Sequence, residues 1–204
     1  MENEINALVY SKNVVEFVTV ANEYCAFVEN ATDLDNQSLI QKLPKILALL
    51  YLKASILPIP SVELEDDNEK FVSELDWQIA KNGIEALLDE SDVYLDFFDQ
   101  DMNELPEPVA GSISENTADI YQDLKDLLEI YKLGNEELSF VAINTCNINF
   151  REFWGFKLVT TLKMLHILNF SKQGVENKLH KLNTQRDKDQ WFLSKAQQDF
   201  QQND

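Results

Sequence analysis

The residues best suited to chemistry are carboxylates that repeat along one predicted helix, residues 112–134. Projected at about 100° per residue, one stripe of this helix holds Glu115, Asp119, Gln122, Asp123 and Asp126. Like charges three or four residues apart repel each other, and each such pair costs an exposed helix about 0.2–0.5 kcal/mol. We therefore expect something cationic to offset the repulsion within this acidic stripe.

The acidic stripe has three interpretations. It is the solvated surface of an acidic protein, since it lies opposite the apolar residues of the same helix. Alternatively, it forms ion pairs inside the domain with cations of the segment 147–170, namely Arg151, Lys157 or Lys163. In the third interpretation Asp119 and Asp123 bind a divalent cation, because carboxylate oxygens are ligands that suit Mg²⁺ or Mn²⁺.

The third interpretation leads to an enzymatic hypothesis. In a metal-dependent hydrolase of phosphorylated small molecules, carboxylates from two helices hold the metal, and a metal-bound water attacks phosphorus. Asp119 and Asp123 would supply one helix here, and Glu23 would supply the other from a predicted helix over residues 13–30.

The elements that position these residues are predicted to be helices. Capping residues and apolar spacings of three and four predict helices over residues 13–30, 38–57, 75–88 and 112–134, and a short helix at 93–98 capped by Ser91. Ser112 and Glu115 form the predicted capping pair of the helix over 112–134, and Gly134 is predicted to end it. With only 5 Gly and 5 Pro, the sequence lacks the regular breaks of a sandwich or barrel. We therefore expect an all-α fold.

The segment 147–170 is predicted to be the central helix of that fold. Its large apolar residues point in all directions, which is typical of a helix at the middle of a bundle; they are Ile148, Phe153, Phe156, Val159, Met164 and Ile167. Trp154 and Gly155 within it predict a point where another helix approaches the backbone closely. The expected architecture is a single-domain bundle of about seven to eight helices over residues 1–170, followed by a polar helical tail over residues 171–204.

The charge distribution favours a basic partner. The formal net charge is −19, and residues 61–139 carry all of the imbalance, with 23 acids against 4 lysines. Such a field repels nucleic acid and anionic membrane surfaces. The longest apolar run, Ile46 to Leu52, is far shorter than the roughly 20 residues of a membrane span, and the first residues are unlike a signal peptide. We expect a soluble, cytoplasmic protein.

Three stretches together resemble a bacterial all-helical domain-of-unknown-function family, number 5063. They are the run Asp119-Ile120-Tyr121-Gln122-Asp123-Leu124, the element from Phe150 to Trp154-Gly155 with His166 after it, and Glu23-Tyr24-Cys25 in a helix that ends at Glu29. The resemblance covers about residues 10–168 and implies a helical fold, with no activity that transfers to a particular residue.

The sequence therefore supports two hypotheses of different classes. The first is a protein-interaction or binding module with an acidic surface, which needs no cofactor and meets a basic protein or a second copy of itself. The alternative is the Mg²⁺- or Mn²⁺-dependent hydrolase, with Asp119, Asp123 and Glu23 as metal ligands. For the module, the candidate binding residues are Asp119, Tyr121, Asp123, Asp126, Arg151 and Trp154.

Overall fold

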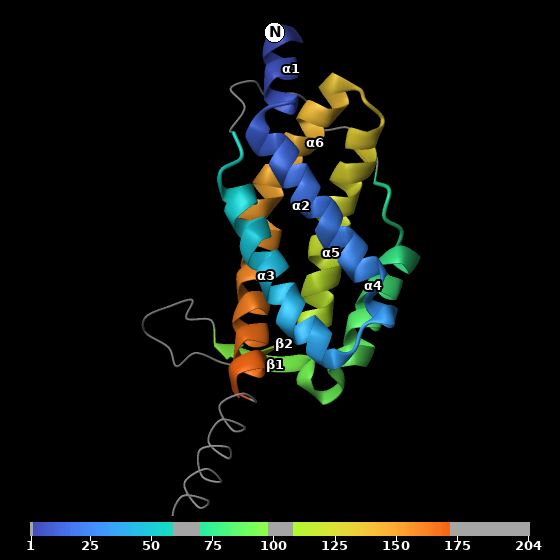
Figure 1. Ribbon diagram of the computed structural model, residues 1–204, viewed down its shortest axis with the longest axis vertical. Helices are drawn as coiled ribbons and strands as arrows, with labels where there is room; N and C mark the ends of the chain where they lie inside the picture. Colours follow the sequence, from blue (N-terminus) through green and yellow to red (C-terminus); the bar gives the residue numbers. More distant parts are fainter. Residues whose placement is uncertain (1, 59–69, 98–107, 172–204) are drawn as a thin grey trace, which may run out of the picture. The chain divides into compact units, whose positions relative to one another are not determined.

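Helix α5, Ile113–Lys132, runs through the middle of the bundle (Figure 1). The computed structural model describes residues 2–58, 70–97 and 108–171. Of the twenty residues of α5, eleven are buried, among them Ser114, Thr117 and Asp126. Short and polar side chains at these positions allow neighbouring helices to pack on several sides of α5, so the helix is central although many of its residues are polar.

The other helices are arranged around α5. Those that pack directly on it are α2 (Lys12–Glu29), α4 (Glu74–Leu88) and α6 (Glu136–Asn149). Helix α3 (Asn36–Ser55) packs on α2, and α1 (Glu2–Val9) packs on α6. Short 3₁₀ turns follow α2 and α4, namely η1 (Ala31–Asp33) and η2 (Asp89–Ser91). This arrangement confirms the predicted all-α class, although the described residues form six α-helices, α1 to α6, and not the seven to eight predicted.

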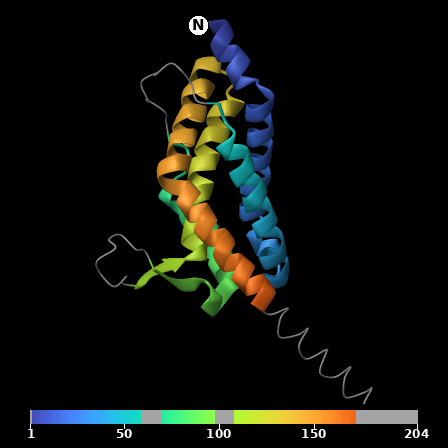
Figure 2. The ribbon, with the colours of Figure 1, turned by 90° about the vertical axis from the view of Figure 1, so that its left-hand side faces the viewer.

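The predicted central position of residues 147–170 does not agree with the structure. The helical residues 155–166, orange in Figure 2, lie on the outside of the bundle. One face is buried through Leu158, Thr161 and Leu165, whereas Phe156 is 68% exposed and Val159 is 49% exposed. The apolar residues on every side of this segment therefore led to a wrong prediction of a central, buried helix. The helix at the centre of the bundle is α5.

A π turn, Phe150–Trp154 (η3), joins α6 to the helical residues that follow. A Cβ atom at Gly155 would lie 2.1 Å from the carbonyl oxygen of Phe150, which is one wide turn earlier in the chain. Gly155 is therefore required by the π turn itself, and the predicted close approach of another helix is not the reason for it. The indole N–H of Trp154 donates to the carbonyl of Cys146 at 3.1 Å, which ties the turn to α6.

Residues 93–98 were predicted as a short helix, and this prediction is wrong for the part that the structure describes. Val93–Phe97 forms strand β1, which pairs antiparallel with strand β2, Pro108–Ser112, in the register Val93 to Ser112 and Phe97 to Pro108. Strand pairing with a segment more than ten residues away is a non-local interaction that a local helical spacing does not reveal. Phe98 lies outside the described residues.

Side-chain caps fix the starts of α3, α4, α5 and α6. Ser73 and Asp76 form a reciprocal capping box on α4, and Asn135 accepts a hydrogen bond from the N–H of Leu138 in α6. Ser112 caps α5 as predicted, accepting from the N–H of Glu115 at 3.1 Å. Helix α2 begins slightly earlier than predicted, directly after Ser11.

The chain divides into two compact units, residues 1–166 and residues 167–204. The predicted C-terminal tail, apart from Ser171, lies outside the described residues. Within the described ranges, no helix has the length and the apolar character that crossing a membrane requires.

Candidate functional site

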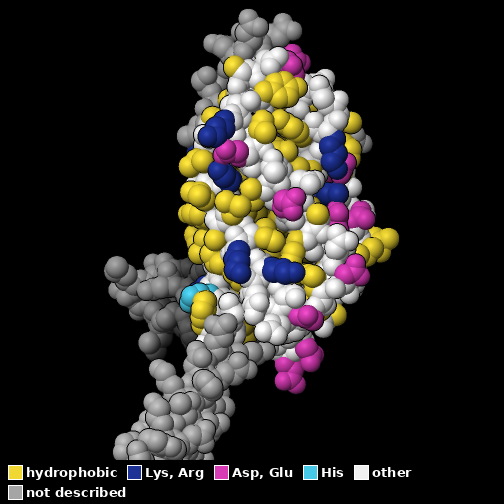
Figure 3. All heavy atoms as spheres, viewed as in Figure 1, with side chains coloured by type: hydrophobic (Ala, Val, Ile, Leu, Met, Phe, Trp, Pro, Cys, Tyr) yellow, Lys and Arg dark blue, Asp and Glu magenta, His cyan; other side chains and the backbone are white. Residues whose placement is uncertain are grey.

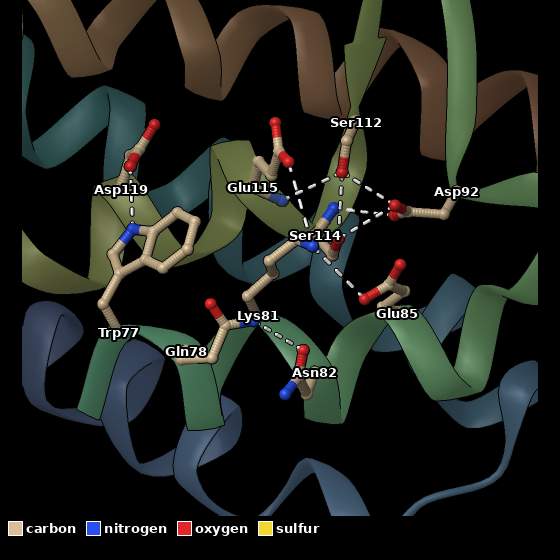
Figure 4. Close-up of polar contacts among 10 residues, drawn as sticks. All are labelled: Trp77, Gln78, Lys81, Asn82, Glu85, Asp92, Ser112, Ser114, Glu115 and Asp119. Atoms are coloured by element: carbon tan, nitrogen blue, oxygen red, sulfur yellow. Dashed lines mark hydrogen bonds and ion pairs between the residues drawn. The ribbon is translucent and has the colours of Figure 1, made fainter. Parts of the chain in front are cut away.

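Asp119 lies between two helices and is engaged by both. One carboxylate oxygen accepts from the indole N–H of Trp77 on α4 at 2.8 Å, and the other accepts from the ammonium group of Lys157. Lys157 also lies over the ring of Phe153, 4.5 Å from its centroid. Figure 4 shows the Trp77 indole directed at Asp119. The ion-pair interpretation of the acidic stripe therefore describes Asp119.

Asp123 and Asp126 lie at least partly inside the fold, so the interpretation of the stripe as a solvated surface is wrong for them. Asp126 is 5% exposed and accepts from the backbone N–H groups of Phe71 and Val72 at 2.8 and 2.9 Å. Asp123 accepts from the side-chain amide of Asn149 on α6 at 2.6 Å. Burial raises the pKa of the Asp123 carboxyl above its ordinary value, and the hydrogen bond from Asn149 opposes that rise.

The carboxylates proposed as metal ligands are not brought into one cluster. Glu23 is exposed on α2, and no hydrogen bond or ion pair among the described residues joins it to Asp119 or Asp123. The described part of the chain has no group of three or more His, Cys, Asp or Glu side chains placed to hold a metal ion. The Mg²⁺ or Mn²⁺ site remains a prediction from the sequence.

Two of the candidate binding residues belong to the π turn. Trp154 is fully buried and serves the packing of that turn, while Arg151 is exposed beside it. Phe150, in the same turn, packs on Tyr51 of α3 with ring centroids 5.4 Å apart. Neither Trp154 nor Arg151 belongs to the lining of the small cavity that Asp123 and Asp126 share.

Tyr121, the remaining candidate, lies at the wall of a groove. Its hydroxyl donates to the carboxylate of Glu29, at the end of α2, at 2.9 Å. The ammonium group of Lys125 lies 2.7 Å from the same Glu29 oxygen. Burial and the adjoining carboxylate raise the pKa of Tyr121 above its ordinary value, so its hydroxyl stays protonated and acts as a donor.

The groove lies where the end of α2, turn η1, helix α4 and helix α5 meet. Its volume is about 310 Å³, and its lining combines apolar side chains with a few polar ones: Val28, Glu29, Ala31, Thr32, Asp76, Ile79, Ala80, Gly83 and Tyr121. The residues from α4 are spaced at three and four, so one face of that helix forms a side of the groove. A Cβ atom at Gly83 would lie 3.4 Å from the Cβ of Ala31, which shows how closely α4 approaches η1.

Acidic side chains are frequent in the segments that line the groove, and two of them, Glu29 and Asp76, belong to its lining. Residues 23–35 and 74–90, which we call the acidic face, carry nine exposed carboxylates and one lysine, Lys81. The carboxylates belong to Glu23, Glu29, Asp33, Asp35, Glu74, Asp76, Glu85, Asp89 and Glu90. Figure 3 shows Asp and Glu side chains gathered at the lower right, over α4 and the end of α2. Lys81 lies between two acids, 3.4 Å from Glu85 and 3.8 Å from Glu115.

Sequence reasoning missed most of this groove. It identified Tyr121, but gave no role to Glu29, Asp76 or Ile79. The only sequence signal that α4 contributes to the groove is the spacing of residues 76, 79, 80 and 83, which places them on one helical face. No local pattern indicated that η1 packs against that face.

These features define an all-helical protein whose polar central helix is enclosed by other helices and whose acidic face contains a groove. The chain belongs to the family described as Domain of unknown function (DUF5063), which matches residues 8–171. This confirms the family resemblance.

The chain is also similar to the crystal structure of protein BF1032 from Bacteroides fragilis. The two share 37% sequence identity with a TM-score of 0.70, and the match covers 79% of this chain and 94% of that one. No curated protein matches the chain.

Proposed function

We propose that this protein is a protein-interaction module that binds a basic segment of a partner protein on its acidic face. The observation that carries the proposal is the concentration of nine exposed carboxylates against one lysine in the two segments that supply most of the lining of a groove of about 310 Å³. One further lysine, Lys125 on α5, pairs with Glu29 at this groove. A surface of one charge sign attracts the opposite charge and speeds association with it. The same field opposes self-association through this face, because two copies would bring like charges together.

A binding role on the acidic face is also consistent with the hydrogen bonding of the three aspartates in the acidic stripe. Asp119, Asp123 and Asp126 are each hydrogen-bonded inside the fold by groups from α4, from α6 or from the segment before α4. Their role is structural in this account, and the exposed carboxylates of the acidic face are the ones available to a partner.

The proposal is tested by fluorescence anisotropy with a labelled lysine-rich peptide of about fifteen residues. The reference ligand is the same peptide with every lysine replaced by glutamate. We expect the native chain to bind only the basic peptide, with an affinity that falls as the salt concentration rises, since exposed charges are screened. Equal binding of both peptides, or binding of neither, would contradict the proposal.

A matched pair of double variants locates the binding surface. Glu74→Gln with Glu90→Gln removes two charges from the acidic face, and Glu137→Gln with Glu152→Gln removes two exposed charges from elsewhere. Both variants have the same net charge. We expect the first variant to lose at least several-fold more affinity for the basic peptide than the second. Equal losses of affinity would show that only net charge matters and would contradict a specific binding face.

A further inference from the structure

We propose that the groove in the acidic face receives the side chain of a single lysine or arginine from the bound partner. This inference rests on the proposed function and adds to it a defined site and ligand class. The volume of the groove, about 310 Å³, is at the small end of the roughly 300–1,000 Å³ that ligand pockets have. The groove therefore suits one extended side chain and is too small for a docked helix.

The lining of the groove matches the two parts of such a side chain. Val28, Ala31, Ile79 and Ala80 provide an apolar surface, on which the methylene stem of lysine or arginine packs while its charged head stays hydrated or paired. A small inorganic cation would leave this apolar surface unused. A purely apolar side chain would make no use of the negative charge that Glu29 and Asp76 bring to the lining.

Glu29 is placed to meet the charged head. The contacts from Tyr121 and Lys125 both use its Oε1 atom, at 2.9 and 2.7 Å, and no contact among the described residues uses Oε2. Asp76 lines the groove as well, and its hydrogen bonds from Ser73 hold its pKa below the ordinary value, so it stays ionised. An arriving cation thus faces two carboxylates, of which one is already shared with Lys125.

The first experiment uses n-butylammonium, which reproduces the stem and the head of a lysine side chain. Amide chemical shifts of the full chain are followed by NMR during titration with n-butylammonium, n-butanol or ammonium chloride. We expect saturable shifts at the amides of Ala31, Ile79, Ala80 and Gly83 with n-butylammonium, and much weaker ones with the alcohol or with ammonium alone. Shifts that are equal for all three probes, or that are spread over the whole acidic surface, would overturn the inference.

The second experiment separates the groove from the face around it. Ile79 lines the groove and is 61% exposed, and Leu75, one turn earlier on α4, is 68% exposed and lies outside the groove lining. Ile79→Arg and Leu75→Arg therefore add the same charge to the same helix at exposed positions, and a thermal melt checks that both variants fold. We expect Ile79→Arg to lower the affinity for the lysine-rich peptide at least tenfold, and Leu75→Arg to lower it no more than about threefold.

The outcomes distinguish this inference from the proposed function. If both arginine variants lower the affinity for the peptide equally, the groove does not receive a side chain of the partner, whereas the acidic face still binds the peptide. If the native chain does not prefer the basic peptide at all, the proposed function fails first. If n-butylammonium binds the groove but the peptide does not, the site recognises a free amine and the assignment to a protein partner is overturned.

Discussion

Asp119, Asp123 and Asp126 follow one another along α5, yet each has a different environment. Asp119 pairs with Lys157 and Trp77, and Asp126 is buried against two backbone N–H groups. Asp123 is partly buried and accepts from a neutral amide. Similar spacing along the helix therefore produces unequal chemistry, because the segments packed against each carboxylate decide whether its charge is compensated.

Asp123→Asn is expected to stabilise the protein at pH 7. Burial raises the pKa of Asp123 in the folded chain, so its ionisation opposes folding increasingly as the pH rises above the unfolded-state pKa, and fully above the folded-state pKa. Asparagine removes the charge and keeps an oxygen that accepts from Asn149. The gain in unfolding free energy should be full at neutral pH and should shrink towards zero below about pH 4, where the carboxyl becomes protonated in the folded and unfolded states alike. Urea unfolding at pH 7 and at about pH 3.5 measures this; a loss of stability at pH 7 would contradict it.

Gly155→Ala is expected to destabilise the protein by about 1–3 kcal/mol, because the new Cβ would lie 2.1 Å from the Phe150 carbonyl oxygen and the π turn would have to shift. Gly83→Ala is the control, since its Cβ would meet Ala31 at the ordinary distance of 3.4 Å. Replacing glycine within a helix gains about 0.5–1 kcal/mol, so this variant should be neutral or more stable. Equal losses at both positions, measured by thermal melts, would show that the π turn does not need glycine.

At the scale of elements, the ends of α5 were predicted correctly from sequence, whereas α2 and α3 begin earlier than predicted, after Ser11 and Asp35, and burial was not predicted. Ser112 starts α5 and Gly134, with φ of +69°, follows its end as expected, because both signals are local. Strand β1 was missed because it depends on pairing with β2. The central helix was misidentified because the hydrogen bonds that accommodate Asp119, Asp123 and Asp126 come from distant segments, so their sequence pattern resembled a solvated stripe.

Two aromatic residues near the π turn provide a test of this arrangement. Trp154 is fully buried, so Trp154→Ala should cost about 3–5 kcal/mol through lost burial and the cavity left behind. Phe156 is 68% exposed, so Phe156→Ala should change the unfolding free energy by no more than about 0.5 kcal/mol. Denaturant unfolding of the two variants distinguishes the outer position of this helix from a central one, for which both losses would be large.

At the scale of the whole molecule, the bundle presents surfaces of different character. The acidic face covers the end of α2, η1 and α4, whereas the segment from Phe153 to Val159 exposes apolar side chains together with the cation Arg151 nearby. The net charge alone predicted a basic partner. It could not predict where that partner binds, since the groove is formed by segments about fifty and ninety residues apart in sequence.

Hydrogen exchange with and without the lysine-rich peptide tests the central claim most directly, because it reports where the peptide binds on the unmodified chain. The account predicts that bound peptide slows amide exchange in the end of α2, in η1 and in α4, and that it leaves residues 148–159 unchanged. Protection that is confined to residues 148–159, or that is absent from α4, would contradict the assignment of the acidic face as the binding surface.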